Sequence, residues 1–300
     1  MPDSSANQGV DQGAAIGVIG GSGFYAMSEL TDSEVVELST PFGAPSSPIT
    51  IGTLHGHRVA FLARHGEGHR TLPEELPARA NIYALKSLGV ERVFSISAVG
   101  SLQEQLEPLH AVIPDQLIDR TRGRPSTFFG DGMVAHIGFA DPFCPQLAAG
   151  LLRAGDASEV TTHSGGTLVV IDGPAFSTRA ESELYRSWGA SIIGMTALPE
   201  AKLAREAELC YAAICFVTDY DVWHEQAADV TADLVIANLI QNVEHGRAIV
   251  SATVTGLSDS RDCDCGEALA SALVTAQELV PAATRERLDL LLRRYRDATP

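Results

Sequence analysis

Short apolar runs alternate with longer amphipathic segments along most of this chain. The short runs are rich in valine, isoleucine and alanine and are bounded by glycine and polar residues, which predicts buried strands. The longer segments repeat apolar residues at helical spacing and predict helices that cover these strands. The predicted strands are residues 15–20, 49–54, 58–63, 92–98, 111–118, 167–172, 191–194 and 212–218, and the predicted helices are residues 77–89, 144–154, 178–188, 199–209 and 232–252.

This alternation predicts an α/β fold, and it continues without an internal repeat or a linker. We therefore expect a single domain over residues 14–257. It would follow a polar, disordered tail at residues 1–13. Residues 258–300 differ in character and predict a helical extension that packs on the domain or on a neighbouring subunit. One helix start has a local signal, because Thr178 is followed three residues later by Glu181, as in a capping box.

Composition narrows the classes of partner. The 300 residues include 38 acidic and 21 basic side chains, giving a net charge of −17. This charge disfavours nucleic acids and anionic membranes, which need a basic surface. No apolar run approaches the roughly 20 residues that span a bilayer. The N-terminus lacks the apolar core of a signal peptide, so we expect a cytoplasmic protein with reduced cysteines.

Two sequence patterns raise the question of a metal. Cys263 and Cys265 form a C-x-C pair, but no second pair has matching spacing, which favours a plain or redox-active thiol pair over zinc. His65 and His69 are four residues apart, but glycines flank the acid between them, unlike the helical zinc motif. We therefore expect no metal.

The candidate chemistry follows the predicted strands, at the sheet edge where α/β proteins bind ligands. Hydroxyls, one guanidinium, one imidazole and glycine backbone can surround a phosphate, and an aromatic ring can cover a base. Two carboxylates at i and i+2 would share one face if the last strand continued. The set predicts a site for phosphate and a nitrogenous base, with acid–base chemistry on the base: Ser22, Arg64, His65, Ser97, Thr196, Phe176, Asp219 and Asp221.

The first glycine-rich loop permits another interpretation. Gly21, Gly23 and Ala26 fit the G-x-G-x-x-A variant of the dinucleotide fingerprint, as in an NAD-dependent oxidoreductase. That fold requires a helix directly after the loop and an acid about 20 residues further on. Residues 26–43 contain no clear helical segment, so we favour a loop that closes around a single phosphate.

Nine segments together carry a family resemblance. They resemble segments of 5′-methylthioadenosine phosphorylases, which belong to the trimeric purine nucleoside phosphorylase family. The segments are, in order, VIGGSGFY, LARHGEGH, ARANIYALKSLG, SAVGSL, PDQLIDRT, FADPFCP, GPAFSTRAES, GMTALPEAKLARE and TDYDVW. The resemblance covers residues 16–223. It implies a mixed, partly barrel-like sheet flanked by helices, in a homotrimer or a dimer of trimers. The implied reaction is reversible phosphorolysis of 5′-methylthioadenosine to adenine and 5-methylthioribose 1-phosphate, with inorganic phosphate as co-substrate and without cofactor or metal.

The resemblance also implies a role for individual residues. Met195 would contact the ribose and Phe176 the base, while His136 would reach the 5′ end of the pocket in a neighbouring subunit. Asp219 and Asp221 would recognise the base. Asp221, alone or together with Asp219 through water, would protonate the leaving purine. The phosphate positions would be Ser22, Arg64, His65, Ser97, Ala98 and Thr196.

The acid pair favours adenine as the base. An ionised carboxylate only accepts hydrogen bonds, which suits the 6-amino group and not a 6-oxo group. Relatives that cleave inosine or guanosine place asparagine at the position of Asp219 and glutamate at that of Ser177. The alternatives are a methylthioinosine or general purine nucleoside phosphorylase, a nucleosidase that uses water, and a non-catalytic nucleoside-binding protein.

Overall fold

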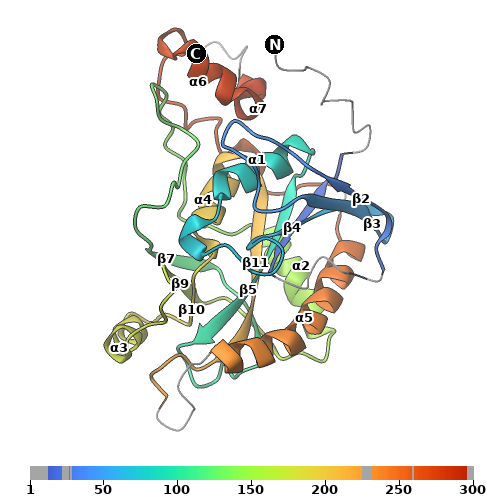
Figure 1. The fold of residues 1–300 in the computed structure, drawn as a ribbon, viewed down its shortest axis with the longest axis vertical. Helices are drawn as coiled ribbons and strands as arrows, with labels where there is room; N and C mark the ends of the chain where they lie inside the picture. Colours follow the sequence, from blue (N-terminus) through green and yellow to red (C-terminus); the bar gives the residue numbers. More distant parts are fainter. Residues whose placement is uncertain (1–12, 22–26, 28, 225–231, 259, 296–300) are drawn as a thin grey trace.

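A mixed β-sheet forms the centre of the computed structural model, which describes residues 13–21, 27, 29–224, 232–258 and 260–295. Helices lie on both sides of this sheet (Figure 1), which confirms the predicted α/β class. The predicted N-terminal tail lies outside the described residues except for Gly13.

The sheet branches at a central strand of ten residues. Strand β5 (Arg92–Ser101) pairs in parallel with β1 and with β11, and its last residues pair antiparallel with β10. Strand β11 also pairs with β6, which pairs in turn with β8. The main order is β2 (Thr31–Val36), β3 (Ile49–Leu54), β4 (His57–Ala63), β1 (Ile16–Gly20), β5, β10 (Ile192–Gly194), β9 (Thr167–Ile171) and β7 (Gln116–Arg120), with β11 (Cys210–Asp219), β6 (Ala111–Ile113) and β8 (Thr162–Ser164) on the branch.

Burial explains why these strands form the centre. Every residue of β1 and β11 is buried, as expected for strands covered on both faces. Each such apolar side chain stabilises the fold by about 1.5–3 kcal/mol. One face packs on α1 (Ala78–Ser87) and α4 (Ala197–Glu206), and the other packs on α2 (Pro145–Asp156) and α5 (Ala232–Thr255).

Helix α3 (Arg179–Ser187) begins as its sequence predicts. The Thr178 hydroxyl accepts a hydrogen bond from the Glu181 amide at 3.2 Å, and the Glu181 carboxylate accepts one from the Thr178 amide at 2.8 Å. This capping box satisfies two backbone donors that a helix start leaves open. It fixes the end of the loop that carries Phe176.

Three predictions about strands need correction. Residues 111–118 belong to two strands, because Pro114 has no donor for a ladder and the segments on its two sides pair with different strands. Strand β8 is only three residues long and was missed. Strand β2 was also missed, because its polar and exposed residues give no apolar alternation; pairing with β3 holds it at the sheet edge.

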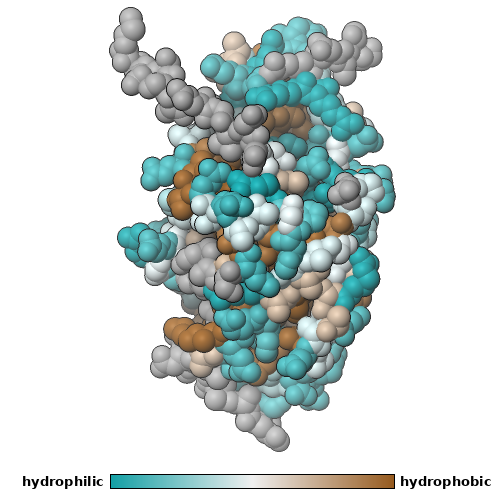
Figure 2. Space-filling model, turned by 90° about the vertical axis from the view of Figure 1, so that its right-hand side faces the viewer, coloured by the Kyte–Doolittle hydropathy of each residue, from teal (hydrophilic) through white to brown (hydrophobic). Residues whose placement is uncertain are grey.

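The segment after residue 257 packs on the same core. It includes α6 (Ala282–Arg287) and α7 (Asp289–Leu292), next to α1 at the top of Figure 1. Leu269 and Leu288 are fully buried within the cluster that also contains α1 and α4. Figure 2 shows a face on which hydrophobic residues are interspersed among hydrophilic ones. None of the described helices is long and apolar enough to cross a membrane.

Candidate active site

A pocket of about 360 Å³ lies at the carboxyl ends of β1, β4, β9, β10 and β11, beside the middle of β5. Its size suits a small organic ligand. The structure does not bring His136 into this pocket, because that side chain is exposed elsewhere. Ser22 lies outside the described residues, although the adjacent Gly21 lines the pocket. The other predicted site residues all line it: Arg64, His65, Ser97, Ala98, Phe176, Met195, Thr196, Asp219 and Asp221.

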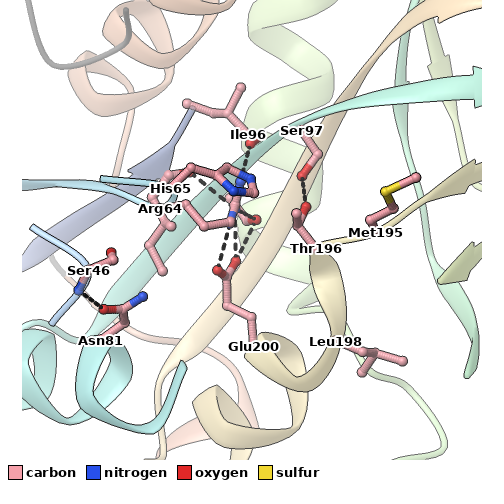
Figure 3. Close-up of polar contacts among 12 residues, drawn as sticks. Ser46, Arg64, His65, Asn81, Ile96, Ser97, Met195, Thr196, Leu198 and Glu200 are labelled. Atoms are coloured by element: carbon pink, nitrogen blue, oxygen red, sulfur yellow. Dashed lines mark hydrogen bonds and ion pairs between the residues drawn. The ribbon is translucent and has the colours of Figure 1, made fainter. Parts of the chain in front are cut away.

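Arg64 is held by a buried carboxylate (Figure 3). Its Nε donates to Glu200 Oε2 at 3.0 Å, and its Nη2 donates to Glu200 Oε1 at 3.1 Å. Its Nη1 donates to the Ile96 carbonyl at 2.8 Å, and its Nη2 also donates to Ser95 Oγ at 2.7 Å. Five guanidinium N–H groups are available, so one on Nη1 remains to reach an anion. The side chain is thereby fixed in one orientation before any ligand binds.

The sequence prediction missed Glu200. The residue lies in the first turn of α4, where an acid interacts favourably with the helix dipole, and it is only 4% exposed. Its Oε1 also accepts hydrogen bonds from Ser95 Oγ at 2.7 Å and from the Tyr211 hydroxyl at 2.8 Å. A buried arginine requires such a partner, and that requirement was the available signal.

A hydroxyl pair and a neutral histidine complete the polar end of the pocket. Ser97 Oγ and Thr196 Oγ1 are 3.1 Å apart. His65 Nδ1 lies 2.8 Å from the Thr71 carbonyl, which can only accept, so Nδ1 carries the proton and Nε2 is an acceptor. Burial, with a smaller contribution from the Arg64 charge, lowers the pKa of His65 to about 4. This end therefore offers both donors and an acceptor to a partly protonated anion.

The two aspartates lie at the other end of the pocket, and a turn rather than a strand brings them together. Strand β11 ends at Asp219, whereas Asp221 has a left-handed φ of 51°. The Asp221 amide donates to Asp219 Oδ1 at 2.8 Å, as in an Asx turn. The expectation that both side chains share a strand face is therefore wrong, although both carboxylates do line the pocket.

The environments of the two carboxyl groups differ. Asp219 Oδ2 accepts a hydrogen bond from Thr218 Oγ1 at 2.7 Å, whereas buried Asp221 Oδ2 has no partner among the described residues. Burial raises the pKa of both groups. For Asp221 the pKa rises to about 6, and the nearby Asp219 charge contributes to this. Asp221 is therefore the carboxyl that more readily holds a proton.

Close contacts fix the shape of the pocket walls. A Cβ at Gly100 would lie 2.9 Å from Asp219 Oδ1, so only glycine leaves this carboxylate in place. A Cβ at Gly173, whose φ is 70°, would lie 2.5 Å from Met195 Sδ. Phe176 remains 44% exposed, so its ring is available to a ligand. The apolar middle of the pocket thus separates its two polar ends.

Two further residues that the sequence prediction did not assign to the pocket also line it, Asn242 and His69. Asn242 of α5 donates to the Val217 carbonyl at 3.2 Å, and its buried Oδ1 has no partner among the described residues. His69 stacks on His65 with ring centroids 4.1 Å apart. Asn242 comes from a helix that lies far along the chain, so only the tertiary fold brings it to the site.

Comparisons with known proteins agree with this arrangement. The family model of the phosphorylase superfamily matches residues 15–255. The S-methyl-5′-thioadenosine phosphorylase of Koribacter versatilis is 55% identical over 94% of this chain and 97% of its own length. A methylthioadenosine phosphorylase structure from an antarctic soil metagenomic library is 51% identical, with a TM-score of 0.90, over 94% of this chain and 99% of that one. An adenosine/methylthioadenosine phosphorylase mutant from Schistosoma mansoni, solved with methylthioadenosine, is 32% identical, with a TM-score of 0.79, over 95% and 99% of the two chains.

Proposed function

The chain belongs to the phosphorylase superfamily and, within it, to the S-methyl-5′-thioadenosine phosphorylases, and we propose that it catalyses the reaction of that group. The reaction is reversible phosphorolysis of 5′-methylthioadenosine to adenine and 5-methylthioribose 1-phosphate. One observation carries this proposal: a single pocket holds an anion-binding end and a pair of buried aspartates, with apolar walls between them.

Inorganic phosphate, as co-substrate, occupies the polar end. The hydroxyls of Ser97 and Thr196 and the remaining Arg64 N–H donate to its oxygens, and the family resemblance adds Ala98 and Ser22 to the phosphate-binding residues. Neutral His65 accepts a hydrogen bond through Nε2 from the P–OH group of monohydrogen phosphate, which keeps its proton. Because these groups are fixed before binding, phosphate is positioned against C1′ of the ribose with little reorganisation.

The base occupies the end with the aspartates. Breaking the C1′–N9 bond places positive charge on the ribosyl ring and negative charge on the purine. Phosphate stabilises the ring and then forms the new bond to C1′. Asp221 donates its proton to the purine, and its raised pKa makes that proton available. Phe176 covers the base and Met195 contacts the ribose.

Asp219 selects adenine. Its carboxylate accepts two protein hydrogen bonds, which oppose the effect of burial on its pKa and favour the ionised form, and in that form it accepts a further bond from the 6-amino group. A 6-oxo group would present a second acceptor to it. A mispaired buried polar group costs about 1–3 kcal/mol, which is roughly ten- to hundred-fold in specificity. No cofactor is required for any of these steps.

The assembly belongs to the same proposal. The enzyme is a cytoplasmic homotrimer, or a dimer of trimers, in which His136 reaches the 5′ end of a neighbouring subunit's pocket. Its side chain is exposed and does not line the pocket of its own subunit, which supports this role. Residues 14–257 carry the reaction and residues 258–300 form an extension. Light scattering measures the subunit number, and His136→Ala should raise KM for methylthioadenosine more than KM for phosphate.

The deciding assay follows adenine release from methylthioadenosine with and without phosphate. Release that depends on phosphate supports a phosphorylase, and equal release without it would indicate a nucleosidase. Inosine and methylthioinosine, measured under the same conditions, separate this enzyme from a general purine nucleoside phosphorylase. Absence of release in every condition would overturn the proposal.

A further inference from the structure

Four cysteines from three distant segments lie together outside the active site. Cys144 directly precedes α2, Cys210 begins β11, and Cys263 and Cys265 lie at a short 3₁₀ turn in the C-terminal segment. Their sulfur atoms all lie within 4.8 Å of one another. The C-x-C motif therefore lies beside a second pair of cysteines, Cys144 and Cys210. Spacing along the chain does not reveal this pair, because its members are 66 residues apart.

The distances suit joint coordination of an ion. Cys263 Sγ lies 3.7 Å from Cys144 Sγ and 3.4 Å from Cys210 Sγ, and all four thiols are free. A disulfide would need about 2.05 Å. Four sulfurs at about 2.3 Å from a tetrahedral zinc ion are about 3.8 Å apart. The observed separations are close to the edges of that tetrahedron.

The surroundings hold these sulfurs in place. Cys144 and Cys210 are fully buried, and their amides donate to the Tyr211 and Glu91 carbonyls at 2.7 and 2.9 Å. Arg92, on β5, donates through Nη2 to the Ser260 carbonyl at 2.9 Å, which fastens the loop leading to the C-x-C pair. The cluster is thus built by the fold and not by a mobile surface loop.

The local electrostatics also favour an anionic centre. Four thiolates around one divalent cation leave a net charge of −2. Arg261 lies against Cys210 and Cys263 and supplies a positive charge. Cys144 stands at the N-terminus of a twelve-residue helix, whose free amides favour a thiolate.

We propose that Cys144, Cys210, Cys263 and Cys265 form a structural site for a thiophilic divalent cation, with Zn²⁺ as its ion. Four S–H bonds break, four Zn–S bonds form, and four protons pass to solvent, without any change of oxidation state. With all four positions filled by protein, the ion has no open position for substrate. It joins the C-terminal segment to the starts of α2 and β11, roughly 30 Å along β11 from Asp219.

The first experiment measures metal content. The full chain is purified in reductant, loaded with Zn²⁺, freed of loosely bound ion and analysed by mass spectrometry for zinc. We expect one zinc per chain, loss of it in Cys263→Ser/Cys265→Ser, and retention in Cys215→Ala. Cys215 is the matched control, because it is the fifth cysteine and lies outside the cluster.

A second measurement remains informative if the double variant does not fold. In the wild-type chain Co²⁺ should give tetrahedral d–d bands and a sulfur-to-cobalt charge-transfer band with the intensity of four thiolates. The single variant Cys263→Ser alters the most accessible ligand and should reduce that band by about a quarter. The proposal is overturned if the wild-type chain binds no metal, if Cys263→Ser/Cys265→Ser keeps its zinc, or if protein purified without reductant has lost two hydrogens per cysteine pair through disulfide formation.

Discussion

The wild-type enzyme should lose stability as pH rises because Asp221 ionises, and Asp221→Asn should not show this loss. The pKa of Asp221 rises from 3.8 to about 6 because the carboxyl is buried, so the folded state holds its proton more tightly than the unfolded state. The contribution of this proton to the stability of the folded state is fully present at low pH, and it is lost as pH rises from about 4 to above 6. A pKa difference of about 2 corresponds to about 3 kcal/mol at neutral pH, of which about 2 kcal/mol develops between pH 4 and 8.

Asparagine has a similar shape but does not titrate, so the difference between the two proteins isolates this carboxyl. Thermal unfolding is measured at several pH values for both proteins. The melting temperature of Asp221→Asn minus that of wild type should increase as pH rises. The relative gain from pH 4 to 8 should be roughly 4 °C. A difference that does not change with pH, or that has the opposite sign, would refute the assignment of the raised pKa to Asp221.

The same substitution tests the catalytic role. If Asp221 protonates the purine, wild-type kcat/KM for methylthioadenosine should fall as pH rises above about 6, because the required proton is lost. Asp221→Asn should lower kcat by about 10²–10⁴ and remove this limb of the pH profile. Unchanged kcat in the variant would show that the proton comes from elsewhere.

The remaining predictions concern groups that position the site. Glu200→Gln leaves Arg64 buried without its countercharge, so the free energy of unfolding should fall by about 3–5 kcal/mol in a denaturant titration. In initial-rate assays, KM for phosphate should rise more than KM for the nucleoside. Gly100→Ala places a methyl group against Asp219 and should lower kcat/KM by roughly tenfold or more. Gly138→Ala, where the added Cβ meets no atom within 4 Å, is its control and should behave as wild type.

Local sequence patterns predict the parts of this fold whose burial is uniform. Strand β1 is apolar throughout and β11 is apolar up to Val217, because the sheet is covered on both faces, and both runs are visible in the sequence. Strand β2 is exposed and polar, so only its pairing with β3 makes it a strand. The pattern of apolar residues along the chain indicates which positions are buried. It therefore misses a strand that is defined only by its backbone hydrogen bonds to a neighbouring strand.

The residues of the site also differ in whether the sequence could predict them. Arg64 and Asp219 were predictable because Arg64 directly follows β4 and Asp219 is the last residue of β11, and the ends of parallel strands meet at one edge of the sheet. Glu200 was not, because its role depends on the burial of a residue 136 positions away. The cysteine cluster was missed for the same reason, since spacing along the chain does not reveal contacts between distant segments.

The pairing of Arg64 with Glu200 also determines how a protein of charge −17 can bind an anion. The guanidinium charge of Arg64 is largely neutralised by the carboxylate, and His65 is uncharged, so these two residues contribute little positive field to oppose the overall repulsion. At Arg64 and His65, binding then depends on short-range hydrogen bonds from groups fixed in advance. Such bonds depend on geometry more than on net charge. Glu200 contributes by holding Arg64 in the orientation that those bonds require, even though it reduces the attraction at long range.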